Sequence, residues 1–303
     1  MELINTFISQ AIVYANIYTL VALGILIGGR VGIFNITGEG ILLAAASSGF
    51  LVSYFSKNWF LGYLTGAFVG AAFGFILVFV HETFKVNQFI IGMALIILGS
   101  GLADLIFNIF AQDLFFPLAP ATPVVTIPYL STIPILSGFI KHNVVVYFMY
   151  ATTVITWWFF YKTKIGLETR AIGENPKAAD VVGINVVKRR YAMTIIGSAL
   201  IGVAGAYLPM ILTGTYTMGL AGGRGYMAIG IVVFASWKPE RAILGAFLFA
   251  AIEVAAYRLQ VMSTGVPYQF FLMLPFIAIL IIMIVFKKHV EFPASVGEAY
   301  SRE

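Results

Sequence analysis

Uncharged apolar runs of about 20 residues recur along this chain and constrain its fold more than any other feature, because each is long enough to cross about 30 Å of hydrocarbon as a helix. The runs are continuous rather than alternating, which favours helices over a β-barrel. Only 10% of the 303 residues are charged, well below the share found in soluble domains. The sequence therefore predicts an all-α polytopic membrane protein with one transmembrane domain over residues 1–303.

Charged, Pro-rich and Asn-rich breaks divide the chain into about nine transmembrane helices. The seventh begins Gly-rich and is also compatible with a half-helix after a re-entrant stretch. Five prolines between residues 111 and 142 predict an external loop there, one that is able to dip back into the membrane. The first run lacks a preceding basic region, so no cleavable signal peptide is expected. The predicted spans are 8–29, 31–55, 59–80, 86–110, 143–161, 191–213, 219–236, 241–259 and 268–286.

The distribution of basic residues predicts the orientation in the membrane. If residues 162–190 lie in the cytoplasm and the nine spans alternate from there, fourteen Lys and Arg fall inside and four outside. Cytoplasmic loops carry such an excess of Lys and Arg. The N-terminus is therefore predicted outside and the C-terminus in the cytoplasm. The four outside residues are Lys57, Lys141, Arg224 and Arg258.

Small residues recur every four positions in two of the spans. In the third span they are Gly62, Gly66, Gly70 and Gly74, and in the sixth they are Ser198, Gly202 and Ala206. A stripe without large side chains lets a neighbouring helix approach closely. These stripes predict a tightly packed helix bundle and say nothing about a substrate.

Ionisable groups inside predicted spans are costly in hydrocarbon and usually face a partner or a water-filled path. Two pairs have residues four apart, which places each pair on one face of a helix. We expect these faces to line a polar route through the bundle; interhelical hydrogen-bond anchoring, or a position nearer the membrane surface, is the alternative. The candidate pathway residues are Asn35, Glu39, Asp104, Asn108 and Glu253. For Arg224, pairing with an outer carboxylate is favoured over substrate contact.

Several kinds of chemistry find no support in the sequence. No G-x-x-x-x-G-K-[ST] occurs, so the chain carries no P-loop for ATP hydrolysis. The three histidines stand at separate helix ends, no metal-binding spacing appears, and there are no cysteines. We therefore expect no catalytic residue, no metal and no cofactor. A conduit with an external energy source is favoured over a membrane enzyme.

One charged block interrupts the apolar chain, since Gly166–Arg190 holds eight of the 31 charged residues. Within it, Asn175 suits an N-cap, Pro176 the first helical position, and Gly183 the left-handed residue after the last turn. These signals predict a helix over 176–182, which is too short to be stable alone in water. A contact with a partner is expected to hold it. Lys188–Arg190 are predicted to anchor the following span at the lipid headgroups.

This block, "GLETRAIGENPKAADVVGINVVKRR", resembles the cytoplasmic coupling loop of ABC-importer permeases, in the branch that moves nucleosides, simple sugars and branched-chain amino acids. Its core "KAADVVGI" is similar to the E-A-A-x-x-x-G signature that docks on ATPase subunits, with Lys177 in place of Glu. Two further stretches strengthen the resemblance. Gly32–Gly49 ("GIFNITGEGILLAAASSG") resembles the second-span motif G-x-x-N-I-G-x-E-G, with Thr37 where Gly is common. Gly223–Phe249 resembles the late Gly-rich span with its turn and following helix.

The resemblance implies a type II ABC-importer-like bundle in a bacterial inner membrane, working beside a second, non-identical permease subunit. Two ATPase subunits and an extracytoplasmic substrate-binding protein or lipoprotein are the other implied partners. "FNITGEG" resembles nucleoside permeases most, and the length resembles their shorter subunit. Simple sugars, riboflavin-like compounds and branched-chain amino acids stay open, as does an ion-coupled secondary transporter. The implied ATPase contacts, within the coupling loop 162–190, are Glu174, Asn175, Pro176, Lys177, Ala178, Ala179, Asp180 and Gly183.

Overall fold

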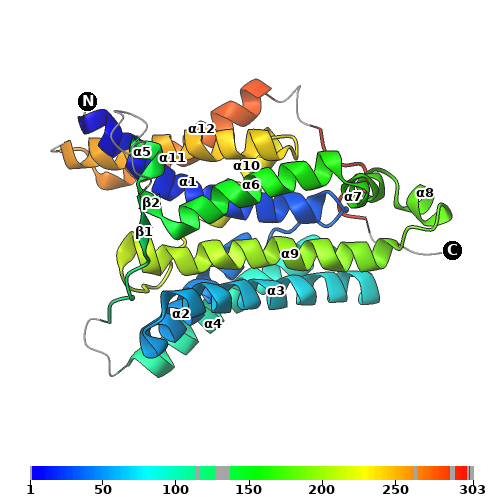
Figure 1. Ribbon diagram of the computed structural model, residues 1–303, viewed down its shortest axis with the longest axis horizontal. Helices are drawn as coiled ribbons and strands as arrows, with labels where there is room; N and C mark the ends of the chain where they lie inside the picture. The colour runs from blue at the N-terminus through cyan, green and yellow to red at the C-terminus, as the bar shows by residue number, and fades with distance from the viewer. Residues whose placement is uncertain are drawn as a thin grey trace.

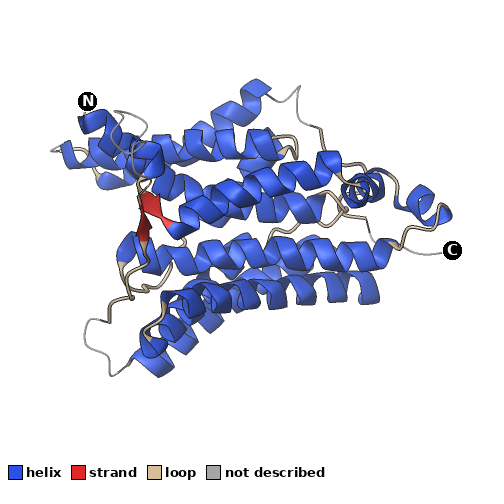
Figure 2. Cartoon of the chain, in the orientation of Figure 1, coloured by secondary structure: helices blue, strands red, loops and turns tan. Residues whose placement is uncertain are grey.

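The computed structural model describes residues 2–112, 117–126, 137–262, 265–286, 291–298 and 300. It is a helical bundle with one short antiparallel β-ribbon (Figures 1 and 2). The elements are α1 (Glu2–Gly29), α2 (Gly38–Ser56), α3 (Trp59–Phe84), α4 (Gln88–Ala111), β1 (Val124–Val125), α5 (Ser137–Ile140), β2 (His142–Asn143), α6 (Val144–Lys162), α7 (Lys164–Glu174), α8 (Pro176–Val181), α9 (Val186–Tyr207), the π-helical turn η2 (Leu208–Thr213), α10 (Arg224–Phe234), α11 (Pro239–Met262) and α12 (Tyr268–Phe286).

Eight helices among the described residues are long and apolar enough to cross a membrane, and they correspond to eight of the predicted spans. They lie along the long axis of the molecule in Figure 1. The N-terminus, α5 and the β-ribbon lie at one end, which we call the ribbon end. Helices α7 and α8 lie at the other, the α8 end. Part of the predicted loop 111–142 lies outside the described residues; its described part contributes β1, α5 and β2 to the ribbon end.

The predicted second span is wrong in its first half, because the helix begins at Gly38 rather than at residue 31. Gly32 has φ +89°, a left-handed conformation that ends the preceding right-handed turn. The side chain of Asn35 then accepts a hydrogen bond from the Thr37 backbone N–H at 3.0 Å, which satisfies that group locally instead of through a helix. Residues 30–37, the α1–α2 linker, therefore run as non-helical backbone into α2.

The predicted full span at 219–236 is also wrong, and the half-helix alternative holds. Helix α10 has only 11 residues. The residues before it include Gly219, Gly222 and Gly223, all with positive φ, so the chain turns repeatedly before a helix can start. The N-terminal turns of α2 and α10 meet, because a Cβ on Gly225 would lie 2.4 Å from the Glu39 backbone nitrogen.

The predicted small-residue stripes form the contact between α3 and α9. A Cβ added to Gly202 would lie 1.9 Å from the Gly66 carbonyl oxygen, and one on Gly70 would lie 2.1 Å from the Ser198 carbonyl oxygen. Gly62 packs instead against Ser53 and Gly49 of α2. The two backbones therefore touch with no side chain between them, which confirms the packing prediction.

Candidate functional site

Glu39 joins the N-terminal turns of helix α2 and the half-helix α10. Its carboxylate accepts hydrogen bonds from the backbone N–H groups of Gly223 and Gly225, each at 2.8 Å. These groups belong to the N-terminal turn of α10, where unpaired amides and the helix dipole favour an anion. Glu39 itself stands in the first turn of α2. One buried carboxylate thus closes the junction between two helix N-termini.

Glu253 of α11 lies on the other side of the same turn. Its Oε1 accepts a hydrogen bond from Arg224 Nη2 at 2.7 Å, and its Oε2 accepts one from the Tyr18 hydroxyl at 2.6 Å. Tyr257 also donates to Oε1, at 3.2 Å. The Arg224 guanidinium stands over the ring of Tyr14, 5.6 Å from its centre. The predicted pairing of Arg224 with a carboxylate is confirmed.

The predicted Asp104 and Asn108 both lie in α4, four residues apart as the sequence suggests. Asp104 accepts a hydrogen bond from the Tyr216 hydroxyl at 2.7 Å, and Asn108 is exposed. Tyr216 belongs to the segment between α9 and α10. All three predicted acids, Glu39, Asp104 and Glu253, are therefore bonded to residues 216–225, which connect α9 to the first turn of α10.

Asn35 does not share a helix face with Glu39, contrary to the prediction, because it lies in the α1–α2 linker and not in α2. Its amide Nδ2 donates to Ser198 Oγ of α9 at 2.8 Å, and its Oδ1 accepts hydrogen bonds from the backbone and hydroxyl of Thr37. The side chain is buried. Its role in the structure is to fasten the linker to α9.

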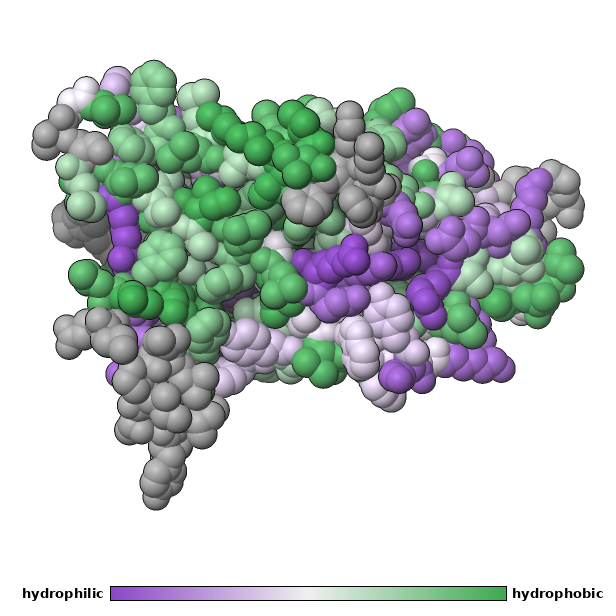
Figure 3. All heavy atoms as spheres, turned by 90° about the horizontal axis from the view of Figure 1, so that it is seen from above, coloured by the Kyte–Doolittle hydropathy of each residue, from purple (hydrophilic) through white to green (hydrophobic). Residues whose placement is uncertain are grey.

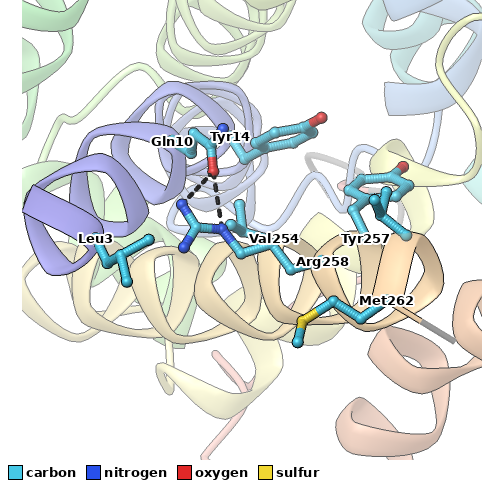
Figure 4. A pocket seen from close by; sticks show the side chains of 8 residues that line it. Leu3, Gln10, Tyr14, Val254, Tyr257, Arg258 and Met262 are labelled. Carbon is cyan, nitrogen blue, oxygen red and sulfur yellow. Dashed lines mark hydrogen bonds between the residues drawn. The ribbon is translucent and has the colours of Figure 1, made fainter.

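A pocket of about 460 Å³ opens between the ends of α1 and α11 that lie near the ribbon end (Figure 4). Arg258 donates to the Gln10 side-chain oxygen from Nη2 at 2.8 Å and from Nε at 3.2 Å. Tyr14 and Tyr257 line the same pocket, with ring centres 5.8 Å apart, and both also contact the Arg224–Glu253 pair. The two tyrosines therefore lie between the pocket and the buried ion pair and contact both.

The predicted short helix at the charged block is present as α8. The side chain of Asn175 accepts a hydrogen bond from the Ala178 backbone N–H at 3.0 Å, Pro176 occupies the first turn, and Gly183 has φ +86°. Of the predicted ATPase contacts, Glu174, Lys177 and Ala178 are exposed, whereas Ala179 is buried against the bundle. Beyond the prediction, α7 forms an additional helix before α8. Apolar Val181 and Val182 are 87% and 74% exposed at the tip of the molecule.

The prediction that Lys188–Arg190 anchor α9 at the headgroups is wrong for Arg190, whose side chain is fully buried and paired with Glu82 at 2.7 Å. Arg189 pairs with Glu168 of α7 at 2.6 Å and is only partly buried. Lys188 alone is exposed. A run of three basic residues gives no local signal of which one turns inward.

Comparisons with known proteins agree with this architecture. The sequence profile described as "Branched-chain amino acid transport system / permease component" matches residues 7–283. A solved ABC transporter of the metal-chelate type, in an inward-facing conformation, superposes with a TM-score of 0.50 at 16% identity, covering 91% of this chain and 86% of that one. At this identity the likeness concerns the fold alone.

Three relatives align over most of their length. A protein named as a glucose ABC transporter permease, TsgC13 of Haloferax volcanii, is 34% identical over 82% of this chain and 76% of its own. The nucleoside ABC transporter permease NupC of Lactococcus lactis is 25% identical over 99% of both chains. The guanosine ABC transporter permease NupQ of Bacillus subtilis is 28% identical over 99% of this chain and 98% of its own. The chain belongs to the permease family of the branched-chain amino acid transport system, and is a polytopic membrane subunit of an ABC transporter.

Proposed function

We propose that this chain is a permease subunit of an ATP-driven importer of nucleosides. It would line the substrate pathway beside a second, non-identical permease, with ATPase subunits at the α8 end and a substrate-binding protein or lipoprotein at the ribbon end. The observation that carries the substrate class is the alignment with NupC and NupQ over 98% or more of their lengths. A simple sugar is the second candidate, because TsgC13 has the higher identity of the three.

Helix α8 supports the placement of the ATPase subunits. A helix of six residues is too short to persist by itself, and two apolar side chains, Val181 at its end and Val182 directly after it, are exposed. Figure 3 shows hydrophilic side chains gathered toward this end of the face in view. A partner that covers α8 would bury these two side chains and hold the helix.

The same end supports the proposed orientation. Arg30 contacts Gly173 of α7, and Lys85 lines one pocket with Asp180 and Gly183, so these two basic residues lie beside the charged block 162–190 at the α8 end. This supports a cytoplasmic α8 end and an external N-terminus. Because the chain has no cysteine, single cysteines at 57 and 177 test the orientation directly. A membrane-impermeant thiol reagent added to intact cells should label position 57 and not position 177; the reverse pattern would overturn the proposal.

The transport function is tested with the reconstituted complex in proteoliposomes, using a panel of labelled nucleosides and glucose. ATP-dependent uptake of a nucleoside, competed by other nucleosides and not by glucose, is expected. Uptake of glucose alone would favour the sugar importer, and uptake that needs a proton gradient instead of ATP would favour an ion-coupled transporter.

Two variants test the docking surface. Asp180→Lys reverses a charge on α8, and Gly183→Val places a β-branched residue at φ +86°. Both should leave the protein in the membrane and uncouple ATP hydrolysis from uptake. Lys141→Glu, a charge reversal on an exposed residue at the ribbon end, is the control. Unchanged uptake in both α8 variants would contradict the docking assignment.

A further inference from the structure

Arg190 connects the start of α9 to three other parts of the chain. Its Nε donates to the Val31 carbonyl oxygen of the α1–α2 linker at 3.0 Å. Its Nη1 donates to Glu82 Oε1 of α3 at 2.7 Å and to the Glu298 carbonyl oxygen near the C-terminus at 3.1 Å. Only residues 182–185 separate α9 from α8. A displacement of α8 therefore reaches Arg190 through one short turn.

The pairing between Arg190 and Glu82 is buried completely, with side chains 0% and 2% exposed. Taking two charges out of water is costly, and a well-packed apolar pair is often as stable. Simple stability therefore does not require charges here. What an apolar pair would lack is the directional bonding of one guanidinium to a linker carbonyl, a helix end and the C-terminal segment at once.

That C-terminal segment, residues 291–298 and 300, is called the strap here because it crosses the α8 end. Ser295 donates from its backbone N–H to the Gly173 carbonyl oxygen of α7 at 2.9 Å, and from its hydroxyl to the same oxygen at 2.8 Å. The Gly297 N–H donates to the Gly32 carbonyl oxygen of the linker at 3.2 Å. Lys85, directly after α3, donates to the Tyr300 carbonyl oxygen. The strap thus fastens α7 to the linker and to the end of α3.

The linker is connected to both α2 and α10. A Cβ on Gly173 would lie 2.4 Å from the Arg30 carbonyl oxygen, so α7 rests directly on the start of the linker. Arg30 donates to the Trp237 carbonyl oxygen, just beyond α10, from Nη2 at 2.6 Å and from Nε at 2.9 Å. At its other end the linker continues into α2 and Glu39. The C-terminal end of α10 and the N-terminal turn of α2 are therefore connected through one non-helical segment, the α1–α2 linker.

We propose that Arg190 is a positioning residue for coupling: with the strap, it transmits movement of α7 and α8 to the α1–α2 linker, and through the linker to helix α2 and the half-helix α10. The proposal rests on the proposed function, since it needs an ATPase that moves α8. It assigns a transport role to Arg190, whose side chain is fully buried.

The test compares neighbouring residues in the reconstituted complex. Arg190→Lys keeps the charge beside Glu82 and loses the fork of donors that reaches three acceptors. Arg189→Lys is the matched control, because Arg189 directly precedes Arg190 and its side chain pairs with Glu168 of α7. We expect Arg190→Lys to hydrolyse ATP within about twofold of the unchanged complex while nucleoside uptake per ATP falls about tenfold. Arg189→Lys should change neither. An unchanged ratio in Arg190→Lys would overturn the proposal.

A second variant separates transmission from folding. Arg190→Met combined with Glu82→Met removes both buried charges. Lys85, which lies 3.6 Å from Glu82 Oε2, is 45% exposed and keeps its bond to the Tyr300 carbonyl oxygen, so insertion and assembly should be retained. The double variant also removes the bonds to Val31 and Glu298. We expect the same loss of uptake per ATP. Normal coupling in this double variant would show that the pair serves packing alone, whatever the single variant does.

The mildest variant addresses the strap. Ser295→Ala deletes only a hydroxyl, and Ser56→Ala, which deletes an exposed hydroxyl bonded to the Val52 carbonyl oxygen, is its control. Uptake per ATP should fall in Ser295→Ala and stay constant in Ser56→Ala; equal ratios would exclude the Ser295 hydroxyl from coupling. If the unchanged complex itself lacks ATP-dependent uptake, the proposed function fails, whereas a working complex with fully coupled variants rejects only the transmission role.

Discussion

Arg224 Nη2 and Glu253 Oε1 lie 2.7 Å apart inside the bundle, with side chains only 9% and 6% exposed. The two residues come from different helices, α10 and α11, so the pair fixes the first turn of a short half-helix against a full span. Removal of one partner would leave a buried charge without compensation, which costs about 3–5 kcal/mol.

Glu253→Leu should therefore lower the melting temperature of the detergent-purified protein, because Arg224 and the Tyr18 hydroxyl lose their shared acceptor. Arg224→Met combined with Glu253→Leu should regain most of the loss, since no charge is left behind. The measurement is thermal unfolding followed by tryptophan fluorescence. A double variant as unstable as the single one would contradict the ion-pair explanation.

Glu39 should be sensitive to the loss of a single oxygen. Its two carboxylate oxygens each accept one backbone N–H, and Gln offers only one acceptor, so Glu39→Gln leaves an amide of Gly223 or Gly225 unpaired. The expected cost is about 1–3 kcal/mol, with reduced uptake. Glu39→Ala should impair uptake more than the amount of protein in the membrane. Normal uptake by Glu39→Gln would mean that the charge is unnecessary and that one hydrogen bond is enough.

The contact between α3 and α9 should not tolerate a single methyl group. Gly202→Ala would place its Cβ 1.9 Å from the Gly66 carbonyl oxygen, so the helices must separate, at about 1–3 kcal/mol. Gly101→Ala, on exposed α4 with no atom within 4 Å of the added Cβ, is the control. We expect a lower melting temperature only for Gly202→Ala. Equal melting temperatures for both variants would rule out the close backbone contact.

The ribbon end should become less stable in acid because of His142. Burial lowers the pKa of this imidazole, and its Nε2–H bond to the Gly138 carbonyl oxygen, 2.7 Å long, offsets the effect only in part. The folded state thus favours the neutral ring. Its stabilising contribution is complete above the unfolded pKa of about 6.5 and is lost as pH falls through the lower folded pKa. His142→Gln should flatten the dependence of melting temperature on pH below about 6.5, and Lys141→Gln should not.

Local signals made some of the structure predictable. Asn175, Pro176 and Gly183 determine the start and the end of α8 within a few residues of chain, so capping rules were sufficient. The breaks before α2 and α10 were different, because the segments there carry few charges and adjoin apolar runs, and hydropathy does not register where backbone hydrogen bonds stop. Glycine conformations and the Asn35 side chain end the helices instead.

Long-range partners account for the rest. Arg190 bonds Val31, which is 159 residues away in the sequence, and Glu82, which is 108 residues away. Nothing adjacent to Arg190 in the sequence therefore distinguishes it from Arg189. The same holds for the residues between α9 and α10, where Tyr216 and Gly223 bond acids from α4 and α2. The acids themselves were predictable as polar groups in apolar spans; their shared contact was not.

The side-chain-free contact between α3 and α9 has a mechanical meaning. The backbones of α3 and α9 touch at Gly66 and Gly202, with no flexible side chains between them to absorb a shift. We therefore expect the two helices to move together as one rigid pair. The pair of helices extends from the turn after α8, where α9 begins, to the ribbon end, where α3 begins. We therefore expect a displacement of α9 at the α8 end to move α3 with it, and so to reach the ribbon end.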